Sequence, residues 1–376
     1  MKKIKYVGYY EPIKSDRNIP LAGKNKMEYI IKTLSDIGYE IEIVSPAMPD
    51  IGRKSEGSNI KISENISIRN FDCYLHQNKF LRAIDLIKFK KSILKYLIQE
   101  TQTGDIVIVY HSLFLYSIIK KLTRKRKINL VMEIEEIYTD VKKNLYISSK
   151  QERKYFDCAS KYIFPTSFLN DAVNYKNKDY ILVHGVYKWE KSISKKFNDN
   201  TIHVVYAGTF NPQKGGAIGA IKAARFLDEK YCVHILGFGS EEEKRNVLKL
   251  IEQESSFCKC RLIYEGEKKG RQFLDFLQKC DIGLSTQNPD GDYNNSSFPS
   301  KILTYMSNGL EVVSINIPVV KNSYVNEQIY YYDTDNPEEI AKAILRVELT
   351  SAESKQKKLE ALDEDFKHKL KRMLEY

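Results

Sequence analysis

Long apolar runs are missing from this sequence of 376 residues. A membrane-spanning helix needs roughly 18 or more consecutive apolar residues. The best stretch, residues 106–119, is interrupted by His111, Ser112 and Ser117. No apolar segment follows the charged start "MKKIKYVGYYEP", so we expect no signal peptide. These absences predict a cytoplasmic protein without a transmembrane helix.

A cysteine framework is also missing. The six cysteines are scattered, and Cys258 and Cys260 form a lone C-x-C with no matching pair and no nearby histidine. Reduced thiols are therefore expected, and a zinc site is not. The segment "GKNK" at residues 23–26 lacks the spacing of a phosphate-binding P-loop. We expect neither a cofactor nor a bound metal.

The positive charge of the chain is confined to its first half. Residues 1–190 contain 33 of the 60 Lys and Arg residues but only 22 of the 49 Asp and Glu residues, and the second half is balanced. Such an excess fits nucleic acid, an anionic membrane surface, a phosphorylated acceptor, or a lysine-rich composition without a partner. No nucleic-acid-binding motif accompanies the charge, so we expect no nucleic acid partner.

The pattern of apolar residues predicts an α/β protein. The 42% hydrophobic and 29% charged content is that of a globular chain, and its length suits two domains. Strands alternate with helices in both halves, which favours parallel sheets with helical crossovers. A polar stretch at residues 188–200 separates the halves. We therefore predict domains at residues 1–190 and 191–350, followed by a charged helix at 351–376.

Three turns in the second half follow predicted strands, where ligands bind in parallel sheets. The first, "YAGTFNPQKGG", contains Gly208 and Lys214, and the second, "LGFGS", contains Gly237 and Gly239. The third is "SSFPSK", in which Ser300 and Lys301 stand at the start of a predicted helix. A helix start with a serine and a lysine suits an anion such as a nucleotide diphosphate. An ordinary capped helix and ordinary packing glycines are the alternatives.

Taken together, these motifs resemble the donor domain of bacterial GT-B glycosyltransferases, particularly those of family 4 type. The likeness lies in the order and spacing of "YAGTFNPQKGG", "ILGFGS" and "SSFPSKILTYMSNGLEVVS". It implies two doubly wound, Rossmann-like domains facing each other across a cleft, with the helix at 351–376 packing back on the first domain. It also implies a nucleotide-sugar donor, a glycan or lipid-linked glycan acceptor, and catalysis without a metal.

The resemblance assigns residues to the donor. Lys214 matches the lysine that holds the diphosphate, Gly23 matches a glycine loop under the phosphates, and Ser300 and Lys301 match the helix start facing the donor. The full set of predicted donor-binding residues is Gly23, Gly208, Thr209, Lys214, Gly237, Gly239, Phe298, Ser300, Lys301 and Thr304.

The sequence departs from the family at three positions. Thr209 stands where many relatives have an arginine, and Ser296 and Thr304 stand where many have a pair of glutamates. The first of those glutamates usually contacts the transferred sugar, and the second contacts the ribose. The departures leave the nucleotide and the sugar open.

The first half offers weaker candidates. His111 ends the strand "DIVIVY", either towards the cleft or as a structural histidine. Glu133 and Glu135 share one face of a predicted strand, as an acceptor-orienting base or as salt-bridged residues. We take His111, Lys214 and Glu135 as the catalytic candidates. The basic helix at residues 80–100 suits either peripheral contact with an anionic membrane or simple coverage of the sheet.

These observations favour a transferase that builds cell-envelope polysaccharide at the inner membrane face, with retention at the anomeric carbon. An epimerase or phosphorylase of the same fold is a second enzyme hypothesis, although it needs more acidic and histidine residues. A non-catalytic partner subunit of another transferase is the alternative from outside the enzymes, suggested by the missing arginine and glutamates.

Overall fold

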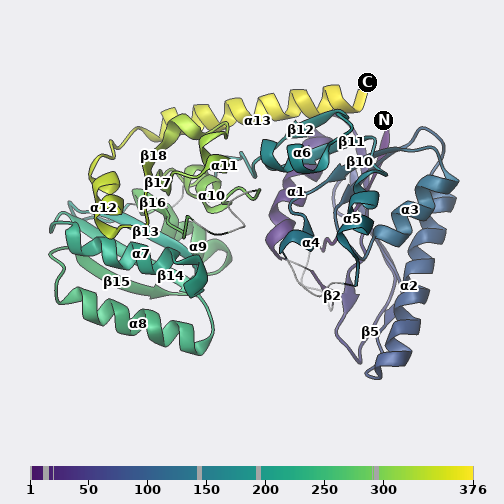
Figure 1. The fold of residues 1–376 in the computed structure, drawn as a ribbon. Coiled ribbons are helices and arrows are strands. Elements are labelled where there is room, and N and C mark those ends of the chain that lie inside the picture. Colours follow the sequence, from purple (N-terminus) through teal and green to yellow (C-terminus); the bar gives the residue numbers. More distant parts are fainter. Residues whose placement is uncertain are drawn as a thin grey trace. The chain divides into compact units, whose positions relative to one another are not determined.

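A computed structural model describes residues 2–11, 17–19, 21–141, 146–191, 196–289, 291 and 296–375. The chain forms two compact units (Figure 1). The first unit contains Met1–Val183 together with Phe366–Tyr376, and the second contains His184–Asp365. The sequence predicted the domain boundary between residues 190 and 191, within the polar stretch. The boundary between the two compact units lies earlier, between Val183 and His184.

The first unit is built on an eight-stranded sheet in the order β12-β11-β10-β9-β1-β3-β7-β6. Its described strands are β1 (Lys3–Val7), β3 (Glu40–Val44), β6 (Ser58–Lys61), β7 (Ile66–Asn70), β9 (Ile106–Tyr110), β10 (Asn129–Glu133), β11 (Lys161–Phe164) and β12 (Tyr180–Leu182). All pairs are parallel except β6 with β7. After β1 the chain adds strands on one side of it, beginning with β3. From β9, the neighbour on its other side, later strands are added in the opposite direction, so β1 and β9 form a topological switch point.

Two parts of this sheet differ from the sequence prediction. The polar stretch after β3, in which no strand was predicted, contains β6 and β7, with Ile66 and Ile68 buried against the sheet. The strand predicted through residues 128–138 ends at Glu133. Short ladders join β2 (Arg17–Asn18) to β4 (Met48–Pro49) and β5 (Lys54–Ser55) to β8 (Cys73–Tyr74).

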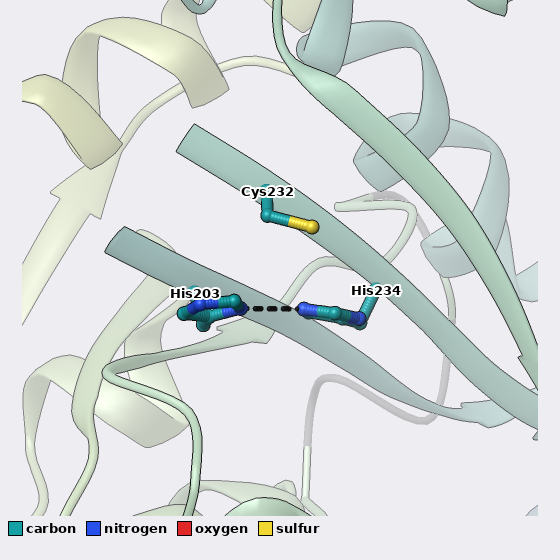
Figure 2. Close-up of side chains that lie close together, drawn as sticks. All are labelled: His203, Cys232 and His234. Carbon is teal, nitrogen blue, oxygen red and sulfur yellow. Dashed lines mark hydrogen bonds between the residues drawn. The ribbon is translucent and has the colours of Figure 1, made fainter. Parts of the chain in front are cut away.

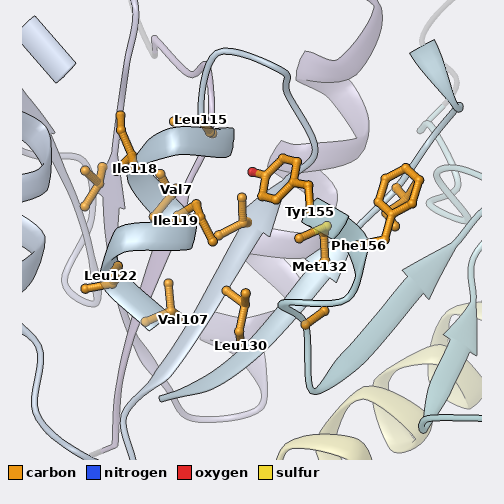
Figure 3. Close-up of a cluster of buried hydrophobic side chains, with 14 of the residues drawn as sticks. Val7, Val107, Leu115, Ile118, Ile119, Leu122, Leu130, Met132, Tyr155 and Phe156 are labelled. Atoms are coloured by element: carbon orange, nitrogen blue, oxygen red, sulfur yellow. The ribbon is translucent and has the colours of Figure 1, made fainter. Parts of the chain in front are cut away.

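One face of the first sheet packs against several helices (Figure 3). These are α2 (Lys79–Glu100), α3 (Tyr116–Lys125), α5 (Ser149–Phe156) and α6 (Ser167–Val173). Alternate strand residues such as Val107, Val109 and Met132 face this core because side chains of a strand alternate between faces. Helix α2 contributes Phe89, Ile93 and Leu97 to it, spaced one turn apart.

Helix α1 (Leu21–Asp36) buries Met27, Ile30 and Leu34 in the first unit. The last residues of α13 (Ala352–Glu375) also belong to this unit. Phe366 of α13 stacks on Tyr29 of α1 with ring centroids 5.4 Å apart. The return of the C-terminal helix to the first domain, expected from the resemblance, is confirmed.

The second unit contains a six-stranded, fully parallel sheet in the order β15-β14-β13-β16-β17-β18. Its strands are β13 (Ile202–Thr209), β14 (Tyr231–Phe238), β15 (Arg261–Gly266), β16 (Ile282–Ser285), β17 (Glu311–Ile315) and β18 (Ile329–Tyr332). In chain order this is 3-2-1-4-5-6, the doubly wound arrangement. The sequence prediction missed β18.

Helices lie on both faces of the second sheet. A layer of contacting helices comprises α7 (Gly216–Ala223), α8 (Glu241–Ser255) and α12 (Pro337–Leu345). The other face carries α9 (Gly270–Leu277) and α10 (Lys301–Ser307), and α11 (Pro318–Lys321) follows β17. None of the helices in the described ranges is long and apolar enough to cross a membrane.

Candidate functional site

The topological switch point of the second unit lies between β13 and β16. After β13 the chain adds β14 and β15 on one side, and from β16 onward it adds strands on the other side. Open parallel sheets bind ligands beyond the carboxyl ends of their strands at this point. Gly208 and Thr209 end β13, and Thr286 directly follows β16. Lys214 and Lys301 come from the two segments that follow these strands, so both cations are delivered to the same edge.

Lys301 is the central cation of this site. Its Nζ lies 4.3 Å from the ring centroid of Tyr206, a buried residue of β13. Gly208 leaves room for the amine, because a Cβ at that position would lie 3.0 Å from Nζ. Burial, together with the nearby charge of Lys214, lowers the pKa of Lys301 to about 7. A partly buried cation beside a second cation suits an anionic ligand.

Helix α10 holds Lys301 in place through Tyr305, one turn further along. The Tyr305 hydroxyl accepts a hydrogen bond from the Ala207 backbone N–H at 2.9 Å and donates to the Leu284 carbonyl at 3.3 Å. The ring lies directly on Gly283, where a Cβ would approach Tyr305 Cγ to 2.3 Å. Since residues i and i+4 share one side of a helix, this anchor sets the position of Lys301.

Lys214 ends a short 3-10 turn, Pro212–Lys214, before α7. Gly215 follows with φ of +67°, a conformation that favours glycine. Gly216 must also be small, because a Cβ there would lie 2.4 Å from the Thr286 carbonyl oxygen. The Lys214 carbonyl accepts a hydrogen bond from Asn288 N–H at 2.8 Å. The side chain of Lys214 is exposed and can therefore reach a ligand.

The other predicted donor residues near α10 have varied surroundings. Ser300 is the exposed N-cap residue, without a side-chain capping bond, and Thr304 Oγ1 donates to the Ser300 carbonyl at 3.2 Å. Thr209 is partly buried, and its carbonyl accepts a hydrogen bond from Tyr206. Phe298 is buried against His184, with ring centroids 5.0 Å apart. Only the backbone or edge of such a ring is available to a ligand.

Gly237 and Gly239 are explained by packing. A Cβ on Gly237 would lie 2.1 Å from the Gly208 carbonyl oxygen, and one on Gly239 would lie 2.8 Å from Glu243 Oε2. The following helix, α8, is closed by a capping box between Ser240 and Glu243. Three glutamates in its first turn disfavour an anion there. The turn "LGFGS" therefore has structural reasons for its glycines.

In the first unit, Gly23 is not in a loop as predicted. It lies in the first turn of α1, which begins at Leu21, three residues before the predicted start. A Cβ on Gly23 would lie 2.5 Å from the Tyr110 hydroxyl, so the glycine allows this tyrosine at the end of β9 to approach the helix. The local physical reason for Gly23 is this close contact.

Glu133 and Glu135 do not share a strand face, because β10 ends at Glu133. Glu133 is fully buried and accepts a hydrogen bond from Tyr6, whereas Glu135 pairs with Lys26 of α1 at 2.5 Å. Burial and the neighbouring Glu135 charge raise the pKa of Glu133. Lys26, Tyr6, Tyr110 and the two glutamates thus gather near the switch point of this unit.

The backbone N–H of His111 donates to the Glu133 carbonyl at 2.8 Å, but the ring of His111 has different neighbours. It is 2% exposed, and the rings of Tyr138, Tyr155 and Phe156 surround it at centroid distances of 4.9–5.5 Å. Its Nε2 is 3.3 Å from Glu152, a buried carboxylate that also accepts the N–H groups of Tyr138 and Thr139. Burial lowers the pKa of His111 to about 3, so the ring is neutral. This is the environment of a structural histidine.

Sequence reasoning missed Tyr206, Tyr305 and Lys26. The two tyrosines were counted only as apolar members of a strand and a helix. The available signals were the two small residues after Tyr206 in "YAG" and the spacing of four residues between Lys301 and Tyr305 in "KILTY". Lys26 was considered only as part of a failed P-loop, and nothing near it in the sequence indicates Glu135 as its partner.

Lys301 should make anion binding depend on pH. A bound diphosphate stabilises the charged amine and raises its pKa from about 7, so affinity should fall as pH rises above 7. We expect a decrease of at least about tenfold between pH 7 and 9, measured calorimetrically. Lys301→Arg stays charged over this range and should bind equally at both values. A wild-type protein as insensitive as this variant would contradict the role of Lys301.

Comparison with known proteins places this geometry in context. Residues 187–365, nearly the whole second unit, match the family model described as Glycosyl transferases group 1. No curated protein sequence matches the chain.

Solved structures match over both units. One is described as trehalose-6-phosphate from E. coli bound with UDP-2-fluoro glucose, with a TM-score of 0.66, 11% identity, and coverage of 100% of this chain and 99% of that one. Another is sucrose-phosphate synthase from Thermosynechococcus elongatus, with a TM-score of 0.68, 11% identity, and coverage of 99% and 98%. A third is α,α-trehalose 6-phosphate synthase from Burkholderia multivorans, with a TM-score of 0.67, 9% identity, and coverage of 100% and 96%. At these identities the likeness concerns the fold, and the predicted GT-B class is confirmed.

Proposed function

We propose that this chain is a GT-B glycosyltransferase that moves a sugar from a nucleotide-sugar to a glycan or lipid-linked glycan, as the match of residues 187–365 to glycosyl transferases group 1 supports. The single observation that carries the proposal is the position of Lys301. Its amine is held beside Gly208 and Lys214 at the switch point of the second unit. That is where a doubly wound sheet receives a nucleotide.

The chemistry proposed for the site is stabilisation of a departing diphosphate. When the bond between the sugar and the diphosphate breaks, negative charge develops on the phosphate oxygens. Two ammonium groups, Lys214 and Lys301, stabilise that charge, and they do most in a site that excludes water. Transfer then needs no metal, and the proposed reaction retains the configuration at the anomeric carbon.

Each remaining donor residue has a proposed place around the diphosphate. The backbone at Gly208 and Thr209 approaches the phosphates, while Ser300 offers a hydroxyl beside Lys301. Thr304, on the next turn of α10, is proposed to lie beside the ribose. Gly237, Gly239 and Phe298 support this edge through packing.

The first unit is proposed to bind the acceptor. The Lys26–Glu135 pair is partly exposed and lies next to the first turn of α1, where Gly23 is found. Glu135 is the proposed group for orienting an acceptor hydroxyl. His111 is proposed to act indirectly, because its backbone N–H joins the end of β9 to the Glu133 carbonyl at 2.8 Å.

The proposed setting is cell-envelope polysaccharide synthesis in the cytoplasm, with peripheral contact at the inner membrane face. Helix α2 supports this because it exposes Phe80, Leu81 and Ile87 alongside Lys88 and Lys91. Apolar side chains flanked by lysines suit an anionic leaflet. The excess positive charge of residues 1–190 favours the same surface.

Sugar transfer itself tests the proposal. Purified protein is incubated with UDP-, GDP-, ADP-, CMP- and dTDP-sugars and with lipid-linked glycan acceptors, and released nucleotide is measured. We expect one donor to release nucleotide faster when an acceptor is present, and we expect Lys301→Ala to abolish the release. Folded wild-type protein that is inactive over the whole panel would contradict the proposal.

A further inference from the structure

Three potential metal ligands lie together at the other end of the second sheet. His203 is near the start of β13, and Cys232 and His234 are near the start of β14 (Figure 2). His203 is directly across from Cys232 in the parallel register, and Cys232 and His234 are two residues apart. All three side chains therefore project from the same face of the sheet.

The ligand atoms of this cluster converge. Nδ1 of His203 is 2.8 Å from Nε2 of His234, and one ligand atom from each of the three residues lies within 4.8 Å of the other two. All three residues are buried. Imidazole nitrogens and a thiolate form a ligand set typical of Zn²⁺.

Each histidine has a carboxylate partner on the ring nitrogen that faces away from the other histidine. Asp199 accepts from Nε2 of His203 at 2.8 Å, and Glu265 lies 3.0 Å from Nδ1 of His234. Metal-binding histidines usually have such a partner on the ring nitrogen that faces away from the metal. The two nitrogens left over, Nδ1 of His203 and Nε2 of His234, are those that face each other.

Two neutral imidazoles do not carry enough protons for the three contacts that their ring nitrogens make. An ionised carboxylate only accepts hydrogen bonds, so Asp199 and Glu265 each require a proton on the imidazole nitrogen facing them. Two neutral imidazoles carry two protons, and both are then used. The contact between the rings requires one further positive charge, supplied by an extra proton or by a metal ion.

Aromatic rings enclose the cluster. Phe197 stacks on His203 at 4.0 Å and on His234 at 5.6 Å, while Phe276 of α9 meets His234 edge-on at 5.3 Å. Such walls fix the orientation of the two imidazoles and limit access of water. Asp199 is partly exposed, which leaves a route for an ion.

We propose that His203, Cys232 and His234 form a binding site for a transition metal ion of the Zn²⁺ class. Zinc–nitrogen bonds of about 2.0–2.1 Å in a tetrahedral site separate the two nitrogens by about 3.3 Å, so the rings need to part by about 0.5 Å. The thiol has to move by about 1 Å and release its proton. Water completes the fourth position.

The proposed metal stabilises the second unit and takes no part in sugar transfer. His203 precedes Gly208 by five residues on the same strand, which corresponds to about 16 Å. An ion at this position bridges β13 and β14 at the end of the sheet opposite Lys301. The site is thus consistent with transfer chemistry that needs no metal.

Metal titration tests this proposal. The full chain, without an affinity tag, is stripped with a chelator and titrated with Zn²⁺ and separately with Co²⁺. We expect one equivalent of either ion to bind at micromolar concentration and to raise the melting temperature. Co²⁺ should also produce a thiolate-to-metal charge-transfer band. Wild-type protein that binds neither ion would overturn the proposal and leave a shared proton between the rings.

Variants assign the ligands. Cys232→Ser should remove the cobalt charge-transfer band, and His203→Gln should weaken Zn²⁺ binding at least tenfold. Cys158→Ser, which removes a thiol of the first unit, is the matched control and should leave both unchanged. Nucleotide affinity of folded Cys232→Ser should equal that of the wild type. Unaltered metal binding in both ligand variants would overturn the assignment.

Discussion

Replacing Lys301 with alanine is expected to weaken nucleotide diphosphate binding about thirtyfold at pH 6.5. The wild-type amine, with a pKa of about 7, is mostly charged at this pH and contacts the phosphate oxygens directly. A hydrogen bond to a charged group contributes about 1.5–3 kcal/mol, and 2 kcal/mol corresponds to about thirtyfold in affinity. Isothermal titration calorimetry measures the change.

Lys321→Ala is the matched control for this variant. Lys321 Nζ lies 4.5 Å from the ring centroid of Tyr331, nearly the same cation–π geometry as Lys301 over Tyr206. Both substitutions remove a lysine that contacts a tyrosine in the second unit. Only the Lys301 variant should lose affinity. Equal affinities in the two variants would remove the phosphate role of Lys301.

Gly237→Ala is expected to destabilise the second unit by about 3 kcal/mol. The added methyl group would lie 2.1 Å from the Gly208 carbonyl oxygen and 2.6 Å from the Phe210 ring. One of these contacts is with backbone, so β13 and β14 must move apart, and overpacking of this kind costs about 1–3 kcal/mol or more. Because Gly208 then shifts as well, nucleotide affinity should fall together with stability.

Urea unfolding followed by tryptophan fluorescence measures this effect. Trp189, the one tryptophan of the sequence, lies close to Gly309 in the second unit and reports on that unit. Gly219→Ala, within α7, is the control, since its closest contact would be the flexible end of Ile340 at 3.2 Å and its other contacts would be at ordinary distances of 3.6 Å or more. It should change stability by less than about 1 kcal/mol. If the Gly237 variant is as stable as this control, packing does not explain the glycine, and a role in ligand binding alone remains.

Residues that are close in sequence made the second unit predictable. The strand–turn–helix order, the glycine turn before α7 and the helix beginning near Lys301 all follow from local periodicity and turn residues. Helix α10 begins at Lys301 with Ser300 as its N-cap residue, at the predicted helix start. The contact of Lys301 with Tyr206 was not predictable, since it joins segments far apart in the chain.

The first unit shows where local reasoning fails. Strand β7 lies in a polar stretch in which no strand was predicted, and its pairing with β3 and β6 makes it a strand. Glu135 was assigned to a strand that ends two residues earlier, at Glu133. The burial of His111 depends on Tyr138, Tyr155 and Phe156, which no spacing rule connects to it. Tertiary packing decided each of these cases.

Calorimetric titration of the wild-type protein with UDP, GDP, ADP, CMP and dTDP tests the central claim most directly. We expect one nucleotide to bind with a stoichiometry of one per chain, and we expect its affinity to fall as pH rises above 7. Folded protein that binds none of the five at millimolar concentration would contradict a nucleotide site at Lys214 and Lys301.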